Sequence, residues 1–256
     1  MLAGLYAGAL EDAELRAKTV SRSKLEGIVS ELKRSTDVLA ALAPSNQIKV
    51  LAEIKRASPS RGKLSEIDDV AALASTYEQA GASAISVLTE GRAFLGSLED
   101  LEGVRSAVAL PLLRKDFIST EYQLLEARAF GADMALLIVA GLPGERLIEL
   151  KSFAEQIGLQ VLVETHSEDE VRFAVDHGCS IVGVNARDLS TFETDRSLFE
   201  KLCHLIPSQT IKIAESAVRS VEDVRQYRDA GADVVLVGEA LVTGDAGSLI
   251  RQFTSV

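Results

Sequence analysis

Short apolar runs rich in β-branched residues recur along the whole chain. Near-continuous apolar runs are typical of strands covered on both faces, as in a parallel sheet. Alternation of polar and apolar positions, which marks a sheet with one wet face, is largely missing from them. Eight such runs predict strands, at residues 48–55, 82–90, 110–117, 132–140, 159–165, 179–186, 210–216 and 232–240.

Amphipathic stretches of about three turns separate these runs. Residues 68–80, 167–177 and 220–230 carry apolar side chains at i, i+3, i+4 or i+7, the spacing of a helix with one buried face. Ser167 with Glu170 gives a capping-box pattern, and Ser220 with Asp223 gives an approximate one. Glycine tolerates the left-handed conformation that ends a helix, so glycines placed just before strands predict a repeated helix-to-strand turn. They are Gly81, Gly131, Gly178 and Gly231.

Eight strand–helix units in 256 residues match the size of a (β/α)8 TIM barrel, which takes about 250 residues. A doubly wound open sheet is the alternative, but it usually has a glycine-rich turn after its first strand. The segment AEIKRASPSRG (52–62) occupies that place here. We therefore predict an α/β fold with one barrel domain over residues 1–256. Within it, residues 1–45 form an extension of one or two helices packed on the barrel.

Composition narrows the class of protein. A net charge of −11 argues against binding to nucleic acid or to an anionic membrane surface. The apolar N-terminus has no preceding positive residues and is short for a membrane span, which favours a helix over a signal peptide. Cys179 and Cys203 are predicted to be buried free thiols, as suits a reducing cytosol, and we expect a cytoplasmic protein. The three histidines lack metal-ligand spacing, so no metal is expected.

Charged and amide residues occur at the ends of five predicted strands, where the catalytic groups of such barrels lie. Glu53 and Lys55 end the first strand and share a face because residues i and i+2 point the same way. Lysine and glutamate are costly to bury unless paired, and a ring of both can supply an acid and a base. The others are Lys115, Glu164, Asn185 and the pair Glu215–Ser216, of which alternation allows only one inward unless the strand has ended.

Three further features indicate a small anionic substrate. The turns after strands seven and eight, 214–218 and 237–241, occupy the place where barrels bind phosphate, and Gly238 would permit close backbone approach. The loop 56–63 holds three basic residues that could contact an anion, although a solvent-exposed basic loop is an alternative. Phe94 and Phe117 follow strands two and three and could wall a flat ring, but core packing is an equally good interpretation of either alone.

These segments together resemble the indole-3-glycerol phosphate synthase family of tryptophan biosynthesis. The similarity is collinear from about residue 48 to 242 and includes all eight predicted strands. It is carried by AEIKRASPSRG, SVLTE with FLGSLEDL, LLRKDFI, GADMALLIVA, VLVETHSEDEV, VGVNARDLSTFETD, IAESAV and VLVGEAL. The resemblance implies ring closure of 1-(2-carboxyphenylamino)-1-deoxyribulose 5-phosphate to indole-3-glycerol phosphate, with loss of CO2 and water. It implies no cofactor and no metal.

The resemblance also implies roles for individual residues. Lys115 would be the general acid of ring closure and Glu164 the base of dehydration, while Lys55 would contact the substrate carboxylate and act as the dehydration acid. Glu53 would orient the lysines. The remaining implied contacts are Asn185 and Ser216 with substrate hydroxyls, Arg187 with the carboxylate, Ser216, Ala217, Gly238 and Glu239 with the phosphate, Ser58 and Ser60 in the anion-contacting loop, Glu215 beside the site, and Phe94 and Phe117 on either side of the anthranilate ring.

Two positions depart from the family pattern. Ala217 stands where the family usually has glycine, so a positive φ there would cost roughly 1 kcal/mol or more. Ala93 stands where a second aromatic residue usually precedes Phe94, which predicts a thinner wall of the ring pocket.

Two other functions remain as alternatives. Phosphoribosylanthranilate isomerase is a sugar-phosphate barrel that uses a Cys/Asp pair at strand ends, but no cysteine ends a strand here. A catalytically silent binding barrel would have no use for so many buried charges. A monomer is expected because no outer helix shows an extra apolar stripe.

Overall fold

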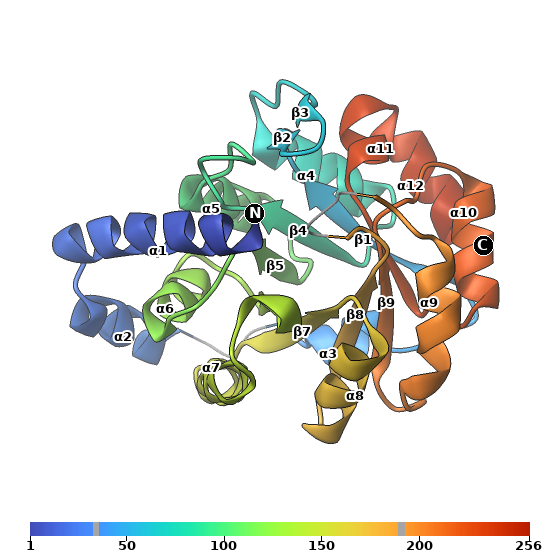
Figure 1. The fold of residues 1–256 in the computed structure, drawn as a ribbon. Coiled ribbons are helices and arrows are strands. Elements are labelled where there is room, and N and C mark those ends of the chain that lie inside the picture. The colour runs from blue at the N-terminus through green and yellow to red at the C-terminus, as the bar shows by residue number, and fades with distance from the viewer. Residues whose placement is uncertain (33–35, 189–192) are drawn as a thin grey trace.

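The computed structural model describes residues 1–32, 36–188 and 193–256 (Figure 1). Eight parallel strands close into a barrel in the order β1-β10-β9-β8-β7-β6-β5-β4. Each of the eight predicted apolar runs contains one of these strands, which confirms the TIM-barrel prediction. They are β1 (Lys49–Ile54), β4 (Ala84–Leu88), β5 (Leu112–Lys115), β6 (Met134–Ile138), β7 (Gln160–Thr165), β8 (Ile181–Asn185), β9 (Ile211–Glu215) and β10 (Val234–Val237).

Helices follow the strands and form the outer ring, as the amphipathic stretches predict. Two short segments lie outside the described residues. Residues 189–192 belong to the segment VGVNARDLSTFETD, and residues 33–35 belong to the predicted N-terminal helical extension. The ring helices are α4 (Val70–Gln79), α5 (Leu98–Ala107), α6 (Glu121–Ala129), α7 (Gly144–Gln156), α8 (Glu168–Asp176), α9 (Ser197–Leu202), α10 (Val221–Asp229), α11 (Glu239–Thr243) and α12 (Ala246–Thr254), with short 3-10 turns η1 (Val139–Gly141) and η2 (Cys203–Leu205).

The two predicted capping boxes differ in the structure. Ser220 and Asp223 form the complete reciprocal pair at the start of α10. At the start of α8 the Ser167 hydroxyl accepts from the Glu170 backbone N–H, as predicted. The Glu170 carboxylate, however, accepts from the backbone N–H of His166 at 2.7 Å and not from that of Ser167. Glu170 therefore fixes the chain one residue earlier, where β7 gives way to the helix.

Alternation along the strands divides the core into two clusters. In β1, Val50, Ala52 and Ile54 pack outward against the helices, whereas Leu51 faces the barrel interior. The other strands repeat this pattern, so each sends one set of side chains outward and the other into the barrel. Val38 and Leu42 of α3 (Val38–Leu42) join the interior cluster with residues at the starts of strands. The short helix α3 thereby closes the N-terminal end of the barrel.

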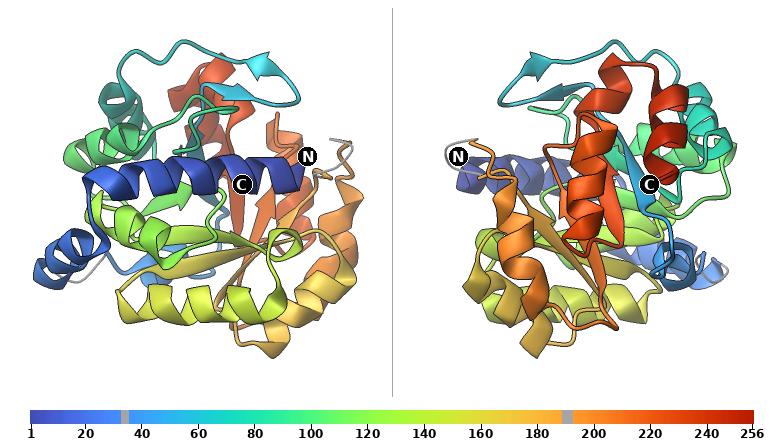
Figure 2. Two further views of the ribbon diagram at one scale, coloured as in Figure 1. Left: turned by 60° about the vertical axis from the view of Figure 1, so that its left-hand side comes forward. Right: turned by 90° about the vertical axis from the view of Figure 1, so that its right-hand side faces the viewer.

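The other N-terminal helices lie on the barrel wall and at its mouth. Helix α2 (Arg22–Glu31) packs against α6, while α1 (Leu2–Thr19) contacts α6 and η1 and runs across the barrel in the left view of Figure 2. Ion pairs attach α1 at two points: Arg16 to Glu126 of α6 at 2.5 Å, and Arg92 to Asp12 at 2.7 Å. The second half of α1 is thus fixed to α6 and to the loop after β4.

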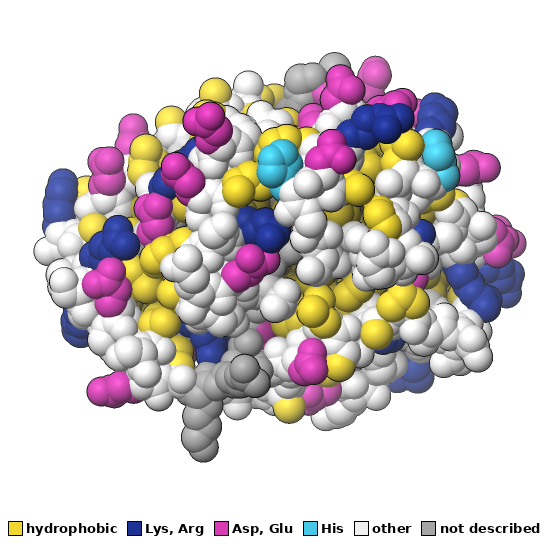
Figure 3. Space-filling view, turned by 90° about the horizontal axis from the view of Figure 1, so that it is seen from below, with side chains coloured by type: hydrophobic (Ala, Val, Ile, Leu, Met, Phe, Trp, Pro, Cys, Tyr) yellow, Lys and Arg dark blue, Asp and Glu magenta, His cyan; other side chains and the backbone are white. Residues whose placement is uncertain are grey.

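The free thiols and the mixed charges on the surface are typical of a globular protein. Cys179 and Cys203 are both free, but only Cys179 is buried. Cys203 is partly exposed, contrary to expectation, because it lies in η2, where its thiol contacts the carbonyl oxygen of Ala230. On the face in Figure 3, acidic and basic side chains are interspersed. No helix in the described ranges is long and apolar enough to cross a lipid bilayer.

Candidate active site

A cavity of about 660 Å³ opens at the C-terminal ends of the strands. Period-two alternation explains its floor: Leu51, Leu113 and Leu162 fill the barrel interior, and the inward positions two residues later carry charge. Glu215 lies beneath the cavity and is only 1 % exposed. The other predicted site residues all line it, namely Glu53, Lys55, Ser58, Ser60, Phe94, Lys115, Phe117, Glu164, Asn185, Arg187, Ser216, Ala217, Gly238 and Glu239.

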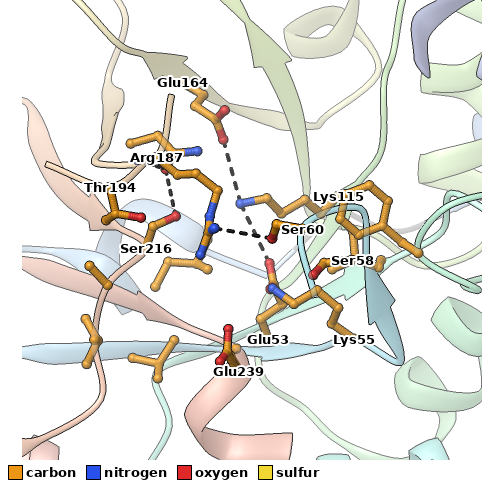
Figure 4. Close-up of a pocket in the computed structure, with 18 of the residues that line it drawn as sticks. Glu53, Lys55, Ser58, Ser60, Lys115, Glu164, Arg187, Thr194, Ser216 and Glu239 are labelled. Carbon is orange, nitrogen blue, oxygen red and sulfur yellow. Dashed lines mark hydrogen bonds and ion pairs between the residues drawn. The ribbon is translucent and has the colours of Figure 1, made fainter. Parts of the chain in front are cut away.

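Lys115 stands at the centre of a cluster of buried carboxylates (Figure 4). Its ammonium nitrogen is 2.7 Å from Oε2 of Glu215 and 3.7 Å from Oε2 of both Glu53 and Glu164. Glu53 also pairs with Lys55, whose nitrogen is 2.5 Å from Oε1. The three carboxyl groups are almost fully enclosed, so a negative charge on any of them needs a cation beside it.

This arrangement separates the proton affinities of the carboxyl groups. Burial disfavours charge on all three, but Lys55 and Lys115 outweigh it at Glu53 and hold the pKa of that carboxyl below its usual value. At Glu215, burial together with the neighbouring charge of Glu164 outweighs Lys115 and raises the pKa. Burial also opposes the charge of Lys115, yet the surrounding carboxylates raise its pKa. One lysine proton and one carboxyl proton are therefore retained beside ionised acids.

The turn after β9 brings two successive residues to the site. The strand ends at Glu215, and Ser216 adopts φ 71°, which turns its side chain inward as well. Its hydroxyl donates to Oδ1 of Asn185 at 2.7 Å, and the same oxygen accepts from the backbone N–H of Arg187 at 3.0 Å. Both Glu215 and Ser216 thus face the centre of the barrel, because the strand has ended between them.

Ala217 continues this turn with φ 62°, the left-handed conformation that glycine adopts without strain. We expect Ala217→Gly to raise the free energy of unfolding by up to about 1.6 kcal/mol. Relief of about 1–2 kcal/mol of strain is partly offset by about 0.4–1 kcal/mol of added freedom in the unfolded chain. Thermal unfolding measures this change. The same substitution at Ala43, where φ is −52°, should be destabilising, and equal effects at both positions would contradict the strain argument.

Two glycines provide room for the carboxylates. A β-carbon at Gly238 would lie 2.3 Å from Oε1 of Glu53, and one at Gly183 would lie 2.1 Å from Oε1 of Glu215. Neither distance is sterically possible without displacing the acid. Gly238 was expected to allow close approach of a phosphate, but it is already needed for the Glu53–Lys55 pair. Gly183 is a further requirement of the site that its place in an apolar strand did not reveal.

The loop after β1 reaches over the cavity as a short hairpin of β2 (Ala57–Ser58) and β3 (Gly62–Lys63). Ser60 accepts from the guanidinium of Arg187 at 3.3 Å, so the hairpin touches the loop after β8. The three basic residues of this loop each pair with a carboxylate. Arg56 pairs with Asp100, Arg61 with Glu239 and Lys63 with Glu66. Arg56 is thereby directed to the loop after β4, and Arg61 spans the mouth to α11.

Phe94 and Phe117 form one continuous wall of the cavity. Their ring centroids are 6.1 Å apart with planes at 44°, which leaves no space for a third ring between them. The two rings are therefore adjacent to each other. The family resemblance had implied that they lie on opposite sides of the substrate's aromatic ring. Leu2 and Leu5 of α1 supply further apolar surface. The Glu90 carboxylate holds this wall by accepting the backbone N–H of Phe94 at 2.9 Å.

Two residues beside the site were not selected from the sequence. His166 lies two positions after Glu164, and the i+2 rule that paired Glu53 with Lys55 would have placed it on the same face. Arg114 precedes Lys115 and therefore points the opposite way, out of the barrel. Its guanidinium is fully buried between β5 and α6, 2.8 Å from Asp116 and 3.3 Å from Glu126. It supports the strand that carries Lys115.

A barrel whose mouth holds half-buried lysines against ionised carboxylates defines a TIM-barrel enzyme that works by acid–base chemistry. The sequence profile described as indole-3-glycerol phosphate synthase matches residues 2–253. The chain is 56 % identical to the indole-3-glycerol phosphate synthase of Leifsonia xyli subsp. xyli over all of this chain and 98 % of that one. It is 49 % identical to that of Mycobacteroides abscessus over all of this chain and 94 % of that one. The chain belongs to the indole-3-glycerol phosphate synthase family.

More distant solved structures share the fold alone. The thiamine phosphate pyrophosphorylase from Pyrococcus furiosus superposes with a TM-score of 0.61 at 15 % identity, covering 82 % of this chain and 94 % of that one. The N-acetylmannosamine-6-phosphate 2-epimerase from Clostridium perfringens gives 0.62 at 16 % identity, over 88 % and 98 %. The isomerase alternative finds no support in the site, because Cys179 precedes β8 and Cys203 lies in η2.

Proposed function

We propose that this cavity closes the indole ring of 1-(2-carboxyphenylamino)-1-deoxyribulose 5-phosphate, a step of tryptophan biosynthesis. The ring carbon that bears the carboxylate bonds to the ketone carbon, and the ketone oxygen takes a proton to become a hydroxyl. The carboxylate then leaves as CO2, and its bonding electrons restore the aromatic ring. Finally the hydroxyl leaves as water while a proton is lost from the new ring. Two protons are supplied and one is removed, which balances the loss of a carboxylate.

Lys115 is the acid of the first step in this proposal. The observation that carries the assignment is its position at the cavity floor with carboxylates at 2.7 and 3.7 Å, which keep it protonated until a substrate oxygen arrives. Glu215 is the nearest of these groups, and it accepts a hydrogen bond from the ammonium of Lys115 at 2.7 Å. The developing alkoxide receives the proton in an enclosed, low-dielectric site, where such a transfer contributes most.

Glu164 is the base of dehydration, and Lys55 supplies the proton to the departing hydroxyl. Glu164 lies across the cavity from Lys55, so the two groups can act on opposite sides of the new ring (Figure 4). Glu53 contacts both lysines and orients them. Lys55 and Arg187 also present positive charge to the carboxylate before it leaves as CO2.

The remaining contacts position the substrate. Oδ1 of Asn185 is occupied by two internal donors, so its amide N–H groups are the part that can donate to a substrate hydroxyl. We assign the phosphate to the backbone of the turns after β9 and β10, with Ser58 and Ser60 above it. The Phe94–Phe117 wall and the leucines of α1 enclose the aromatic ring. We accordingly propose that residues 1–45 belong to the catalytic unit of a single-domain barrel.

The test is turnover of the purified full-length chain with this substrate, followed by indole fluorescence. The wild-type protein should form indole-3-glycerol phosphate, and Glu164→Gln should lower kcat by about 10²–10⁴-fold, the usual contribution of a positioned base. Glu168→Gln, on the exposed face of α8, serves as the control and should leave kcat unchanged. Absence of turnover in the wild type would overturn the function, and full activity of the Glu164 variant would overturn the assignment of the base.

A further inference from the structure

His166 lies behind Glu164, on the side away from Lys115. The residue directly follows β7, and its ring Nε2 is 3.3 Å from Oε1 of Glu164, whereas Lys115 faces Oε2 at 3.7 Å. Its side chain is 12 % exposed, and it is not among the residues that line the cavity. Glu164 is therefore held between two cationic side chains, and of these two Lys115 lines the cavity and can reach the substrate.

A second carboxylate occupies the other side of the imidazole. Nδ1 of His166 is 3.3 Å from Oε2 of Glu170, and the same oxygen accepts the His166 backbone N–H. A carboxylate 3.3 Å from each ring nitrogen favours a proton on both, which is the imidazolium form; the contact of Nε2 with Glu164 is an ion pair without hydrogen-bond geometry. Burial would lower the pKa of His166, but Glu164 and Glu170 outweigh it and raise that pKa to about 10. Among the described residues these two carboxylates are the charged groups that act on it.

The resting charges of the site pair off one to one. Glu215 keeps its proton, so Lys55 and Lys115 match Glu53 and Glu164, and the imidazolium of His166 matches Glu170. Once Lys115 has given up its proton, His166 is the cation that stays in contact with Glu164 among the described residues. Burial alone would raise the pKa of Glu164, and His166 followed by Lys115 reverses this and lowers it. The imidazolium is thus the main support of the ionised form of Glu164, ahead of the lysine.

The support that His166 gives to Glu164 becomes important once the reaction has begun. Lys115 loses its positive charge when it protonates the ketone oxygen, which in the proposed sequence precedes the step that needs Glu164. At that moment Glu164 would face Glu53 and Glu215 with one cation fewer, and it would tend to take the proton of Glu215 or one from water. His166 does not react, so its charge persists through the whole sequence.

We propose that His166 is a positioning residue that keeps Glu164 ionised and oriented after Lys115 has given up its proton. This inference rests on the proposed role of Glu164 as the base of dehydration. His166 touches no substrate, so it acts on kcat and leaves KM unchanged. Because Glu164 must be ionised to act, activity is present above its pKa and lost as the pH falls through it. Removing the cation moves that loss to higher pH.

The experiment compares the pH dependence of kcat in four full-length proteins. His166→Gln should lower kcat about tenfold at pH 7, because Glu164 loses its orientation and the cation that keeps it ionised once Lys115 is neutral. The variant should keep KM within twofold and move the acid limb of the profile upward by about one pH unit or more. His166→Lys, which restores a cation, should recover much of the loss. His177→Gln, at the exposed end of α8, is the matched control and should behave as wild type. An unchanged profile in His166→Gln, or an effect confined to KM, overturns the proposal.

A second readout does not depend on turnover. Imidazole proton signals in NMR should show His166 still charged above pH 8 in the wild type, and Glu164→Gln should make it titrate at lower pH. A His166 signal that titrates near pH 6.5 in the wild type overturns the proposal even where kinetics are ambiguous. Full activity of Glu164→Gln would instead refute the proposed base, while the NMR coupling between the two residues would remain. The two failures are therefore distinguishable.

Discussion

Replacing Lys115 by methionine should lower kcat for indole formation by about 10³-fold, within the range of a lost general acid. Methionine has a similar length and no proton to give, so the ketone oxygen would have to be protonated by water. The loss should persist across the pH range, because no other described cation lies at the centre of the floor formed by Glu53, Glu164 and Glu215. Stopped-flow or steady-state indole fluorescence measures the effect.

Removal of this lysine also leaves carboxylates with less compensation, so folding must be checked separately. Circular dichroism and Tm should show that Lys115→Met remains folded, because Glu215, the carboxyl group nearest to Lys115, already holds a proton. Lys151→Met is the matched control, since Lys151 is equally enclosed and paired with Glu155 at 2.8 Å, but lies on the outer helix α7. Its kcat should stay within twofold of wild type. A folded Lys115 variant with kcat within tenfold of wild type would contradict the assigned acid.

The second large effect concerns stability. Arg114→Met should lower the free energy of unfolding by about 3–5 kcal/mol, because breaking a buried ion pair leaves the partner charge enclosed without compensation. Arg114 is fully buried, and Asp116 and Glu126 are 5 % and 2 % exposed. Arg16 continues to neutralise Glu126, so most of the loss arises at Asp116. For a chain of this size the fall in Tm should be roughly 6–20 °C.

The control for this prediction is Arg172→Met on α8, which removes an exposed pair with Glu168 and should cost less than about 1 kcal/mol. KM should also respond to the loss of Arg114. Asp116, which it holds at 2.8 Å, accepts the backbone N–H of Phe117, so the aromatic wall should loosen and KM should rise. Equal Tm values for the two variants would show that the buried network contributes little.

The barrel and most of its floor could be predicted because both follow from one rule. Continuous apolar runs indicate parallel strands, and residues two positions apart share a face, which places Glu53 and Lys55 together. The rule could not show that β9 ends at Glu215, since the turn depends on positive φ at Ser216 and Ala217. It also could not show that Phe94 and Phe117 are adjacent, because contacts between loops depend on distant carboxylates such as Glu90.

Other features of the site were not predicted because they depend on the side chains that surround them in the fold. Gly183 reads as an ordinary residue of an apolar strand, and only the position of Glu215 on β9 reveals the need for an absent side chain. His166 was assessed only as a metal ligand, although its position two residues after Glu164 is visible in the sequence. The basic loop was correctly seen as charged, but the carboxylates that pair with Arg56 and Arg61 lie far away in the sequence.

The reacting groups are divided between the first and the second half of the barrel. Lys55 and Lys115 come before η1, whereas Glu164, Asn185 and Ser216 come after it. A cut within residues 139–143 would give two half-barrels, one holding the proton donors and the other the base and the hydroxyl contacts. Neither half alone could complete the sequence of proton transfers. Indole fluorescence from a mixture of the fragments would therefore report their reassembly, which makes this barrel a natural complementation sensor.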